Sequence, residues 1–359
     1  MNENQEPIKL KKTSKLGKEI LVKYKPKKDL NRKATSYIEK HLSTPSIVRF
    51  ESCHSFMRFL TTEKLDKKRL EITNACGNRF CPICTWKTAK KDAIKISILL
   101  ESIKCQESLE YIFLTLTSPN VTGEDLKDEI DKFNRSINRL FARTKVKKVV
   151  QGYVRKLEVT TDQEKNITDE LYKRKENYFA KRGLKVGDAN PQYGTYNPHV
   201  HIILAVKQSY FDDTKSYISQ AEWLDMWRDC MKDPSITQVD VRKVRASEKS
   251  KSNAILEIAK YSAKGSDLYH SESVFDTFYM ALKKRQLLVY SGMFKVYAKM
   301  YERGELDSYK ETDDAIYTHL LRSLWNNSKY ESTLRELTPE EFEKYNERAL
   351  KIEESDEVE

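Results

Sequence analysis

Residues 198–204 read PHVHIIL, and this stretch decides the fold of the chain. Its β-branched and apolar residues predict a strand, on which successive side chains point to opposite faces of a sheet. His199 and His201 therefore share one face, while Val200 and Ile202 point into the opposite layer. Two imidazoles on one face form half of a metal site, and the alternative is a pair of histidines that make only structural hydrogen bonds.

Strand and helix patterns alternate on both sides of this stretch. Three further segments have the β-branched and aromatic content of strands, namely 111–117, 149–160 and 236–244. Two segments repeat apolar residues at helical spacing, 124–144 and 220–231. The order β-α-β-β-α-β predicts an α+β fold of the split βαβ type, as in ferredoxin-like and RRM-like domains, with an antiparallel sheet. In this pattern the first and third strands are central, and the second strand pairs beside the third.

Segments of different composition flank this domain. We expect four parts along the chain: a flexible basic arm at 1–45, a small module with a cysteine cluster at 46–105, the split βαβ domain at 106–300, and a helical extension with an acidic tail at 301–359. Residues 161–196 form a long polar insertion between the second and third strands, and we expect this insertion to be mobile.

Charge is unevenly distributed along the chain. The chain holds 65 Lys and Arg against 54 Asp and Glu, yet residues 331–359 hold 11 acidic and 4 basic residues. The remaining body is therefore strongly basic, which favours a polyanionic partner, because basic side chains near phosphates release condensed counterions. We expect Arg155 and Lys156 to contact phosphates of such a partner, and Tyr193 and Tyr196 to stack on an extruded single strand if the polyanion is a nucleic acid. The alternative is an ordinary basic surface.

Apolar patterning argues against a membrane protein. The longest apolar stretches, such as 200–206, fall well short of the ~18 residues of a membrane span, and the first residues are rich in lysine. Six cysteines in 359 residues are too few for a disulfide scaffold. We therefore expect a cytoplasmic protein without a membrane partner.

Four cysteines crowd into the second part of the chain. Their spacing is Cys53-x22-Cys76-x4-Cys81-x2-Cys84. Four thiolates at tetrahedral reach would hold a structural Zn²⁺ ion, with His54 as a substitute for Cys53. The alternatives are simple reduced cysteines or a redox pair.

A third ligand for the histidine pair is expected on the neighbouring strand. In KLEVT at 156–160, Lys156, Glu158 and Thr160 share the polar face of the strand that is predicted to pair with the histidine strand. Glu158 is therefore the candidate ligand. A carboxylate suits Mg²⁺ or Mn²⁺, which prefer oxygen and keep open positions for a phosphate. The alternative is an exposed glutamate on an edge strand.

A second group of reactive side chains lies in EIAKYSAK at 257–264. On a helix Glu257 and Tyr261 share a face, and Lys264 lies one turn further on the same side. This arrangement places a base, a nucleophile and a cation together. Tyrosine is a weak nucleophile at its free pKa of about 10, so attack on a phosphodiester needs a metal-polarised phosphate and a nearby cation. The alternative is an ordinary helix surface.

Together these motifs resemble a known family. FLTLTSPN at 113–120, NPHVH at 197–201 and residues 257–264 look like the three motifs of the HUH endonuclease superfamily, and specifically those of the type 1 rolling-circle replication initiators (Rep proteins) of Gram-positive plasmids. The resemblance covers roughly residues 50–300 and includes YSG at 290–292 and the cysteine cluster. It implies an HUH-type fold and a metal-dependent, site-specific DNA endonuclease and strand transferase with a tyrosine nucleophile.

The resemblance also implies roles for individual residues. His199 and His201 match the metal-binding pair of the family. Tyr261 matches the tyrosine that nicks one strand at the double-strand origin, joins the 5′-phosphate and frees a 3′-OH that primes leading-strand synthesis. Glu257 matches a position where related initiators carry a second tyrosine, and a carboxylate there can activate water for termination. Lys264 matches a lysine that we expect at the scissile phosphate.

This interpretation implies plasmid origin DNA as the partner, single-stranded or in a cruciform at the nick site, together with a host helicase and DNA polymerase. A mobilisation relaxase or transposase of the same superfamily would share the histidine pair and the tyrosine. An alternative from another class is a non-catalytic, zinc-stabilised nucleic-acid-binding protein, whose aromatic residues would stack on bases. An endonuclease of this superfamily needs His199, His201 and Tyr261 together for its function, whereas a non-catalytic binding protein does not.

Overall fold

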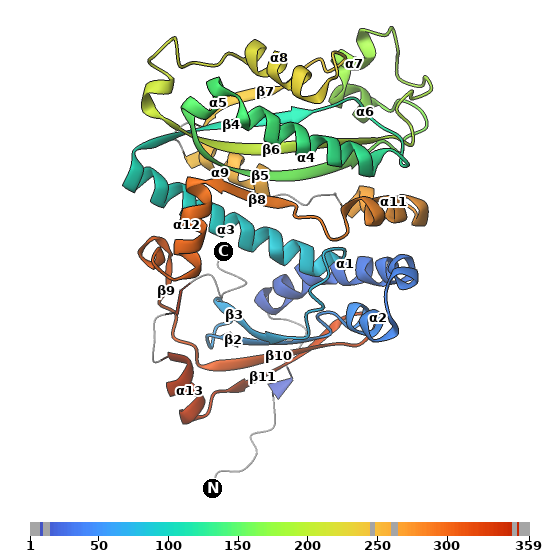
Figure 1. Cartoon of the computed structure of the whole chain (residues 1–359). Coiled ribbons are helices and arrows are strands. Elements are labelled where there is room, and N and C mark those ends of the chain that lie inside the picture. The colour runs from blue at the N-terminus through green and yellow to red at the C-terminus, as the bar shows by residue number, and fades with distance from the viewer. Residues whose placement is uncertain (1–7, 10–14, 245–247, 260–264, 347–349, 352–359) are drawn as a thin grey trace. The chain divides into compact units, whose positions relative to one another are not determined.

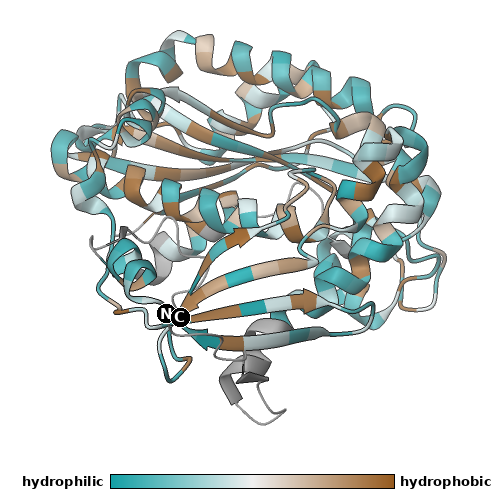
Figure 2. Cartoon of the chain, turned by 90° about the horizontal axis from the view of Figure 1, so that it is seen from below, coloured by the Kyte–Doolittle hydropathy of each residue, from teal (hydrophilic) through white to brown (hydrophobic). Residues whose placement is uncertain are grey.

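The computed structural model describes residues 8–9, 15–244, 248–259, 265–346 and 350–351. The chain folds into two units: unit 1 comprises Met1–Ser102 with Lys299–Glu359, and unit 2 comprises Ile103–Ala298. Each unit is built on a five-stranded antiparallel sheet. Figure 2 shows hydrophobic residues along the strands and alternating colours along the helices, as expected for amphipathic elements around a core. Among the residues described, no helix has both the length and the hydrophobicity of a membrane span.

The sheet of unit 2 has the strand order β7-β4-β6-β5-β8. Its strands are β4 (Leu109–Thr117), β5 (Val150–Thr161), β6 (Tyr196–Lys207), β7 (Asp240–Val244) and β8 (Leu288–Gly292). The first and third predicted strands, β4 and β6, are central, and β5 pairs beside β6, so the split βαβ prediction is confirmed. Strand β8 adds an edge that the sequence pattern did not predict.

Helices cover both faces of this sheet (Figure 1). α4 (Leu126–Ala142) and α8 (Gln220–Met231) lie on one face, and α9 (Glu248–Ala259) lies on the other. α8 begins in a capping box formed by Ser219 and Glu222. Nε1 of Trp227 on α8 donates a hydrogen bond to the Thr117 carbonyl oxygen at 2.8 Å, which fixes this helix at the end of β4. Unit 2 also contains α5 (Thr144–Val149), η2 (Gln208–Tyr210), α10 (Gly265–Leu268) and α11 (Glu272–Leu282).

Two glycines allow β8 to approach β5. Gly152 on β5 lies opposite Gly292 on β8. A Cβ atom on Gly152 would lie 2.6 Å from the Met293 nitrogen and 2.7 Å from the Ser291 oxygen, closer than real side chains come to a backbone. Gly292 also has a φ of +55°, in the left-handed region that favours glycine. The close pairing of β5 with β8 therefore requires glycine at both positions.

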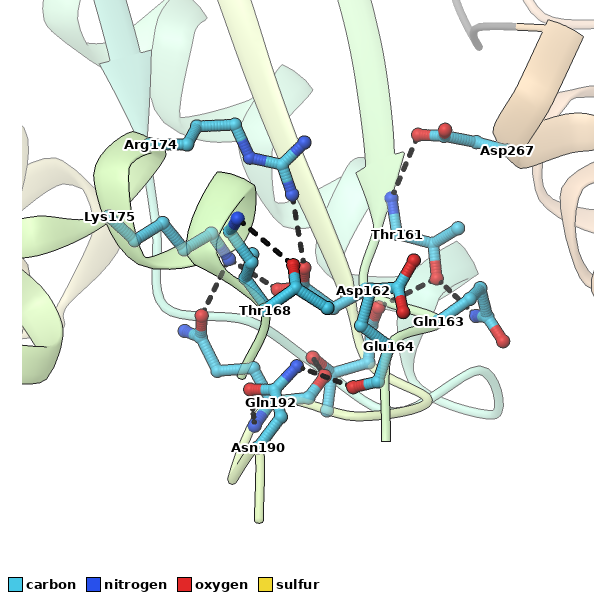
Figure 3. Close-up of polar contacts among 12 residues, drawn as sticks. Thr161, Asp162, Gln163, Glu164, Thr168, Arg174, Lys175, Asn190, Gln192 and Asp267 are labelled. Atoms are coloured by element: carbon cyan, nitrogen blue, oxygen red, sulfur yellow. Dashed lines mark hydrogen bonds and ion pairs between the residues drawn. The ribbon is translucent and has the colours of Figure 1, made fainter. Parts of the chain in front are cut away.

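The insertion between β5 and β6 is a folded lobe, not the mobile loop expected from its polar composition. It contains α6 (Asp169–Arg174) and α7 (Glu176–Ala180). A small core of its own is formed by Ile167, Leu171 and Phe179. Figure 3 shows the polar network at its base, where the buried carboxylate of Asp162 pairs with Lys175 and Arg174. A few converging apolar residues and this charge pairing are enough to order the segment.

The sheet of unit 1 has the strand order β1-β11-β10-β2-β3. Its strands are β1 (Ile8–Lys9), β2 (Phe56–Thr61), β3 (Lys68–Thr73), β10 (His319–Trp325) and β11 (Tyr330–Glu336), and β9 (Thr312–Asp313) pairs separately with β12 (Leu350–Lys351). Its helices are α1 (Lys15–Ile38), η1 (Glu39–His41), α2 (Thr44–Glu51), η3 (Asp307–Tyr309) and α13 (Pro339–Asn346), with parts of α3 (Pro82–Glu107) and α12 (Met293–Glu302).

Two expectations for unit 1 differ from the structure. The helical extension expected after residue 300 is wrong for 319–336, where β10 pairs with both β11 and β2. Part of the expected flexible arm forms α1, whose Tyr24, Ala34 and Ile38 are fully buried. Segments from both ends of the chain therefore build one unit with the cysteine module.

Candidate functional site

The two histidines of β6 and a glutamate of β5 converge on one face of the unit 2 sheet. Glu158 lies directly across the strand pair from His199. Its Oε2 atom lies 3.0 Å from Nε2 of His201 and 3.3 Å from Nε2 of His199. We call Glu158, His199 and His201 the metal-site trio. Their ligand atoms all lie within 4.8 Å of one another. The structure thus brings the three candidate ligands together around one point.

Neighbouring polar groups orient both imidazoles. Nδ1 of His199 lies 3.2 Å from the Asn197 carbonyl oxygen, and Nδ1 of His201 lies 3.2 Å from Oγ1 of Thr115 on β4. A carbonyl only accepts hydrogen bonds, so Nδ1 of His199 carries the hydrogen. In neutral His199, Nε2 and the facing Glu158 oxygen are then both acceptors, and their separation of 3.3 Å requires a cation or a proton between them. The donor set therefore fits a metal ion.

Glu158 is held in its charged form. Its side chain is buried, and burial by itself raises the pKa of the carboxyl. Interactions with the facing imidazoles of His199 and His201 outweigh burial and hold the Glu158 pKa well below its usual value of 4.5. At neutral pH the trio therefore offers a carboxylate and two imidazoles to a cation.

A second carboxylate reaches the trio from the helix on the same face. Oε1 of Glu257, on α9, lies 3.5 Å from Nε2 of His201. α9 ends at Ala259. Tyr261 and Lys264, the candidate nucleophile and cation, lie outside the described residues. In the sequence, both residues follow directly after the helix that brings Glu257 to the trio.

The expected DNA-contacting residues of β5 point in opposite directions. Lys156 lies across from His201, on the face of the trio. Arg155 occupies the other face, since neighbouring side chains of a strand alternate. Of the two expected stacking tyrosines, Tyr196 is only 4% exposed, whereas Tyr193 is 46% exposed. The exposed ring of Tyr193 is therefore accessible to a DNA base, whereas the buried ring of Tyr196 is not.

The four cysteines of unit 1 form a second candidate metal centre. The Sγ atoms of Cys53, Cys76, Cys81 and Cys84 lie within 4.8 Å of one another, and all four are free thiols. Hydrogen bonds with Cys53, Cys76 and Cys81 hold the pKa of Cys84 well below its usual value, which favours a thiolate. Nδ1 of His54 lies 3.1 Å from Sγ of Cys53, so His54 borders the quartet while Cys53 belongs to it. A set of four sulfurs fits a closed tetrahedral zinc site.

Helix α1 supplies polar contacts to this quartet that the sequence did not reveal. Nδ2 of Asn31 donates to Sγ of Cys81 at 3.7 Å. Nζ of Lys28 donates to the carbonyl oxygens of Glu51 at 2.6 Å and Cys53 at 2.8 Å. Both side chains are buried. Such partners orient metal ligands, and a buried ammonium offsets the negative charge of thiolates.

Comparison with known proteins assigns the chain to a family. A family model described as "Replication protein" matches residues 67–330. A relative named "Protein rep", from Staphylococcus aureus, is 40% identical over 251 residues, which cover 70% of this chain and 96% of the relative. The chain belongs to this replication protein family.

Other relatives of the replication protein carry the same name. "Protein rep" of Streptococcus pneumoniae serotype 2 is 33% identical over 88% of this chain and 89% of the relative. "Protein rep" of Bacillus amyloliquefaciens is 30% identical over 78% of this chain and 82% of the relative. No solved structure matches the chain. The predicted resemblance to plasmid replication initiators is thus confirmed, and the matched region contains the metal-site trio and Glu257.

Proposed function

We propose that this replication initiator is a metal-dependent endonuclease and strand transferase that nicks one strand at the double-strand origin of a plasmid. The observation that carries the proposal is the convergence of the metal-site trio with Glu257, from the helix that precedes Tyr261. In the sequence, Tyr261 follows Glu257 by four residues, a length of chain that spans at most about 14 Å. Three protein ligands also leave coordination positions open, as a catalytic metal site needs.

The nicking step uses the tyrosine as nucleophile. The trio would hold Mg²⁺ or Mn²⁺, which polarises the scissile phosphate when bound. The phenolic oxygen of Tyr261 attacks phosphorus, and the bond from phosphorus to the 3′ oxygen breaks. The phenolic proton of Tyr261 passes to solvent, the leaving 3′ oxygen takes a proton from solvent, and the Lys264 ammonium stabilises the charge that develops on this oxygen. The products are a 5′-phosphotyrosine and a 3′-OH primer.

Termination uses the carboxylate of Glu257. Glu257 accepts a proton from water, and the water oxygen attacks the phosphorus of the phosphotyrosine. The bond from phosphorus to the Tyr261 oxygen breaks, which releases the protein. The position of Glu257, 3.5 Å from Nε2 of His201, supports this role because it places the carboxylate beside the trio.

The remaining contacts of the chain support binding of DNA. Thr115 and Asn197 hold the imidazoles in place. Lys156 lies on the same face and is buried, so we assign it to a phosphate held at the trio and not to the exposed DNA backbone. The partner is origin DNA, single-stranded or in a cruciform at the nick site, and a host helicase and DNA polymerase would extend the 3′-OH. Zn²⁺ at the cysteine quartet would stabilise unit 1.

A covalent-adduct assay tests the proposal. The full chain is incubated with a labelled single-stranded origin oligonucleotide and Mn²⁺, and a denaturing gel reports the protein–DNA adduct. We expect an adduct that Tyr261→Phe removes. No adduct with any candidate origin, or an adduct that survives Tyr261→Phe, would reject Tyr261 as the nucleophile.

Binding to double-stranded origin DNA distinguishes a catalytic from a binding role. His201→Ala should abolish nicking and leave this binding largely intact. His201 is only 5% exposed and its ring contacts Glu158, so it is not available to bound duplex DNA. Equal loss of nicking and binding would favour a nucleic-acid-binding module. Adduct formation at a transfer origin or a transposon end, and not at a replication origin, would favour a relaxase or transposase.

A further inference from the structure

A cavity of about 300 Å³ lies on the face of the unit 2 sheet opposite the metal-site trio. It is lined by Asn134, Arg155, Leu157, Arg285, Gln286 and Val289, and is called the Arg155 cavity below. Because side chains alternate along β5, Arg155 points away from the face that carries Lys156 and Glu158. The cavity is therefore separate from the candidate nicking site.

Arg155 brings a buried charge to this cavity. The residue is only 8% exposed, and its Nε atom has no hydrogen-bond partner. In the described part of the chain its side chain has uncharged partners: Nη2 donates to Oδ1 of Asn134 at 3.0 Å, and the side chain of Tyr153 is a further contact. Within the described ranges no carboxylate pairs with Arg155. A guanidinium removed from water without a counter-ion is costly, so the site is built to receive an anion.

The second arginine of the cavity does not supply free charge. Nη1 of Arg285 lies 2.5 Å from Oδ1 of Asp131, and Nη2 lies 3.0 Å from Oδ2 of the same carboxylate. Nη2 also donates to the Lys127 carbonyl oxygen, and Nε donates to that of Ala281. Asp131 therefore neutralises the charge of Arg285, and the uncompensated positive charge of the cavity belongs to Arg155.

We propose that the Arg155 cavity binds a phosphate group. A guanidinium presents a planar fork of donors that matches phosphate oxygens. Oδ1 of Asn134 accepts from Arg155, which leaves the Nδ2 hydrogens of Asn134 as donors, and the exposed amide of Gln286 can donate as well. The volume of the cavity lies at the lower end of the range of ligand pockets. The phosphate belongs either to bound DNA or to a free phosphate compound such as a nucleotide.

A charge-reversal pair tests the site. Asn134→Asp places a carboxylate against the Arg155 guanidinium and so supplies an internal counter-ion with almost no change of shape. Asn138→Asp adds the same charge one turn further along α4, at an exposed position, and is the matched control. Inorganic phosphate and a deoxynucleoside triphosphate are titrated into the full chain without added divalent metal, and thermal unfolding is recorded.

We expect the phosphate compounds to raise the melting temperature of the wild type and of Asn138→Asp, because a ligand that binds the folded state stabilises it. Asn134→Asp should unfold at a higher temperature than the wild type in phosphate-free buffer and should lose the response to phosphate. Arg155→Gln should also lose the response. If Asn134→Asp responds to the phosphate compounds as the wild type does, the Arg155 cavity is not their site.

An oligonucleotide without an origin sequence identifies the source of the phosphate. If a phosphate of DNA occupies the cavity, the slope of log affinity against log salt for a single-stranded oligonucleotide should decrease in magnitude by about 0.7 in Asn134→Asp relative to Asn138→Asp. An unchanged slope, together with a nucleotide response that depends on Arg155, assigns the cavity to a free phosphate compound. If Asn134→Asp changes neither the DNA slope nor the nucleotide response, the proposal is wrong. None of these readouts requires nicking, so the result is independent of the proposed function.

Discussion

Replacement of Glu158 with Gln should remove most of the affinity of this protein for divalent metal. Glu158 supplies the negative charge of the metal-site trio, and its Oε2 atom lies within 3.3 Å of both imidazole Nε2 atoms. Gln keeps the shape of the side chain and removes the charge. Loss of an outer partner of a metal ligand typically weakens metal binding 10–100-fold. Loss of the charged ligand itself should exceed about 100-fold, or about 2.7 kcal/mol.

Binding of Mn²⁺ can be measured apart from nicking. Electron paramagnetic resonance reports free Mn²⁺, so a titration of the full chain gives the dissociation constant directly. Glu110→Gln is the matched control, because Glu110 lies near the other end of the sheet, across from Val206. We expect wild-type affinity in this control and nicking in Glu158→Gln only at greatly raised Mn²⁺. Mn²⁺ binding by Glu158→Gln within threefold of the wild type would refute Glu158 as a ligand.

Three further variants test other parts of the molecule. Glu257→Ala should nick DNA but accumulate the covalent adduct, because no carboxylate activates water for release; release at the wild-type rate in a single-turnover gel assay would contradict this role. Cys84→Ser should lower the zinc content per chain, measured by atomic emission, and the melting temperature, since structural zinc contributes folding energy; an unchanged zinc content would reject the quartet. Gly152→Ala should lower the free energy of unfolding by about 1–3 kcal/mol, because its methyl group overlaps backbone atoms of β8. Denaturant unfolding that matches the wild type would count against this close packing.

The sheet of unit 2 and its metal-site trio were accessible from sequence because their signals are local. Alternation along β6 places His199 and His201 on one face, and alternation along β5 places Glu158 with them once the two strands pair. The same rule did not reveal the environment of Arg155. β5 is buried on both faces, so alternation alone does not show which polar side chains have partners.

Unit 1 was less predictable because its buried positions depend on tertiary contacts. Along α1, Tyr24, Lys28, Asn31, Ala34 and Ile38 are buried at helical spacing. Two members of this stripe are polar, so a search for apolar periodicity misses it. Their burial makes sense only beside the cysteine quartet, which they contact from a distant part of the chain. The strands at 319–336 gave a weak signal for a similar reason, since β10 pairs with β2, a strand more than 250 residues earlier in the sequence.

The two ends of segment 260–264 are both tied to the strands that carry the trio. On the side before this segment, Glu257 on α9 contacts His201 of β6. On the side after it, Oδ2 of Asp267 on α10 accepts a hydrogen bond from the Thr161 nitrogen, at the end of β5 (Figure 3). Glu158 lies three residues before Thr161 on the same strand. Two residues that flank this segment in the sequence, Glu257 and Asp267, therefore contact the two strands that carry the metal ligands, one strand each.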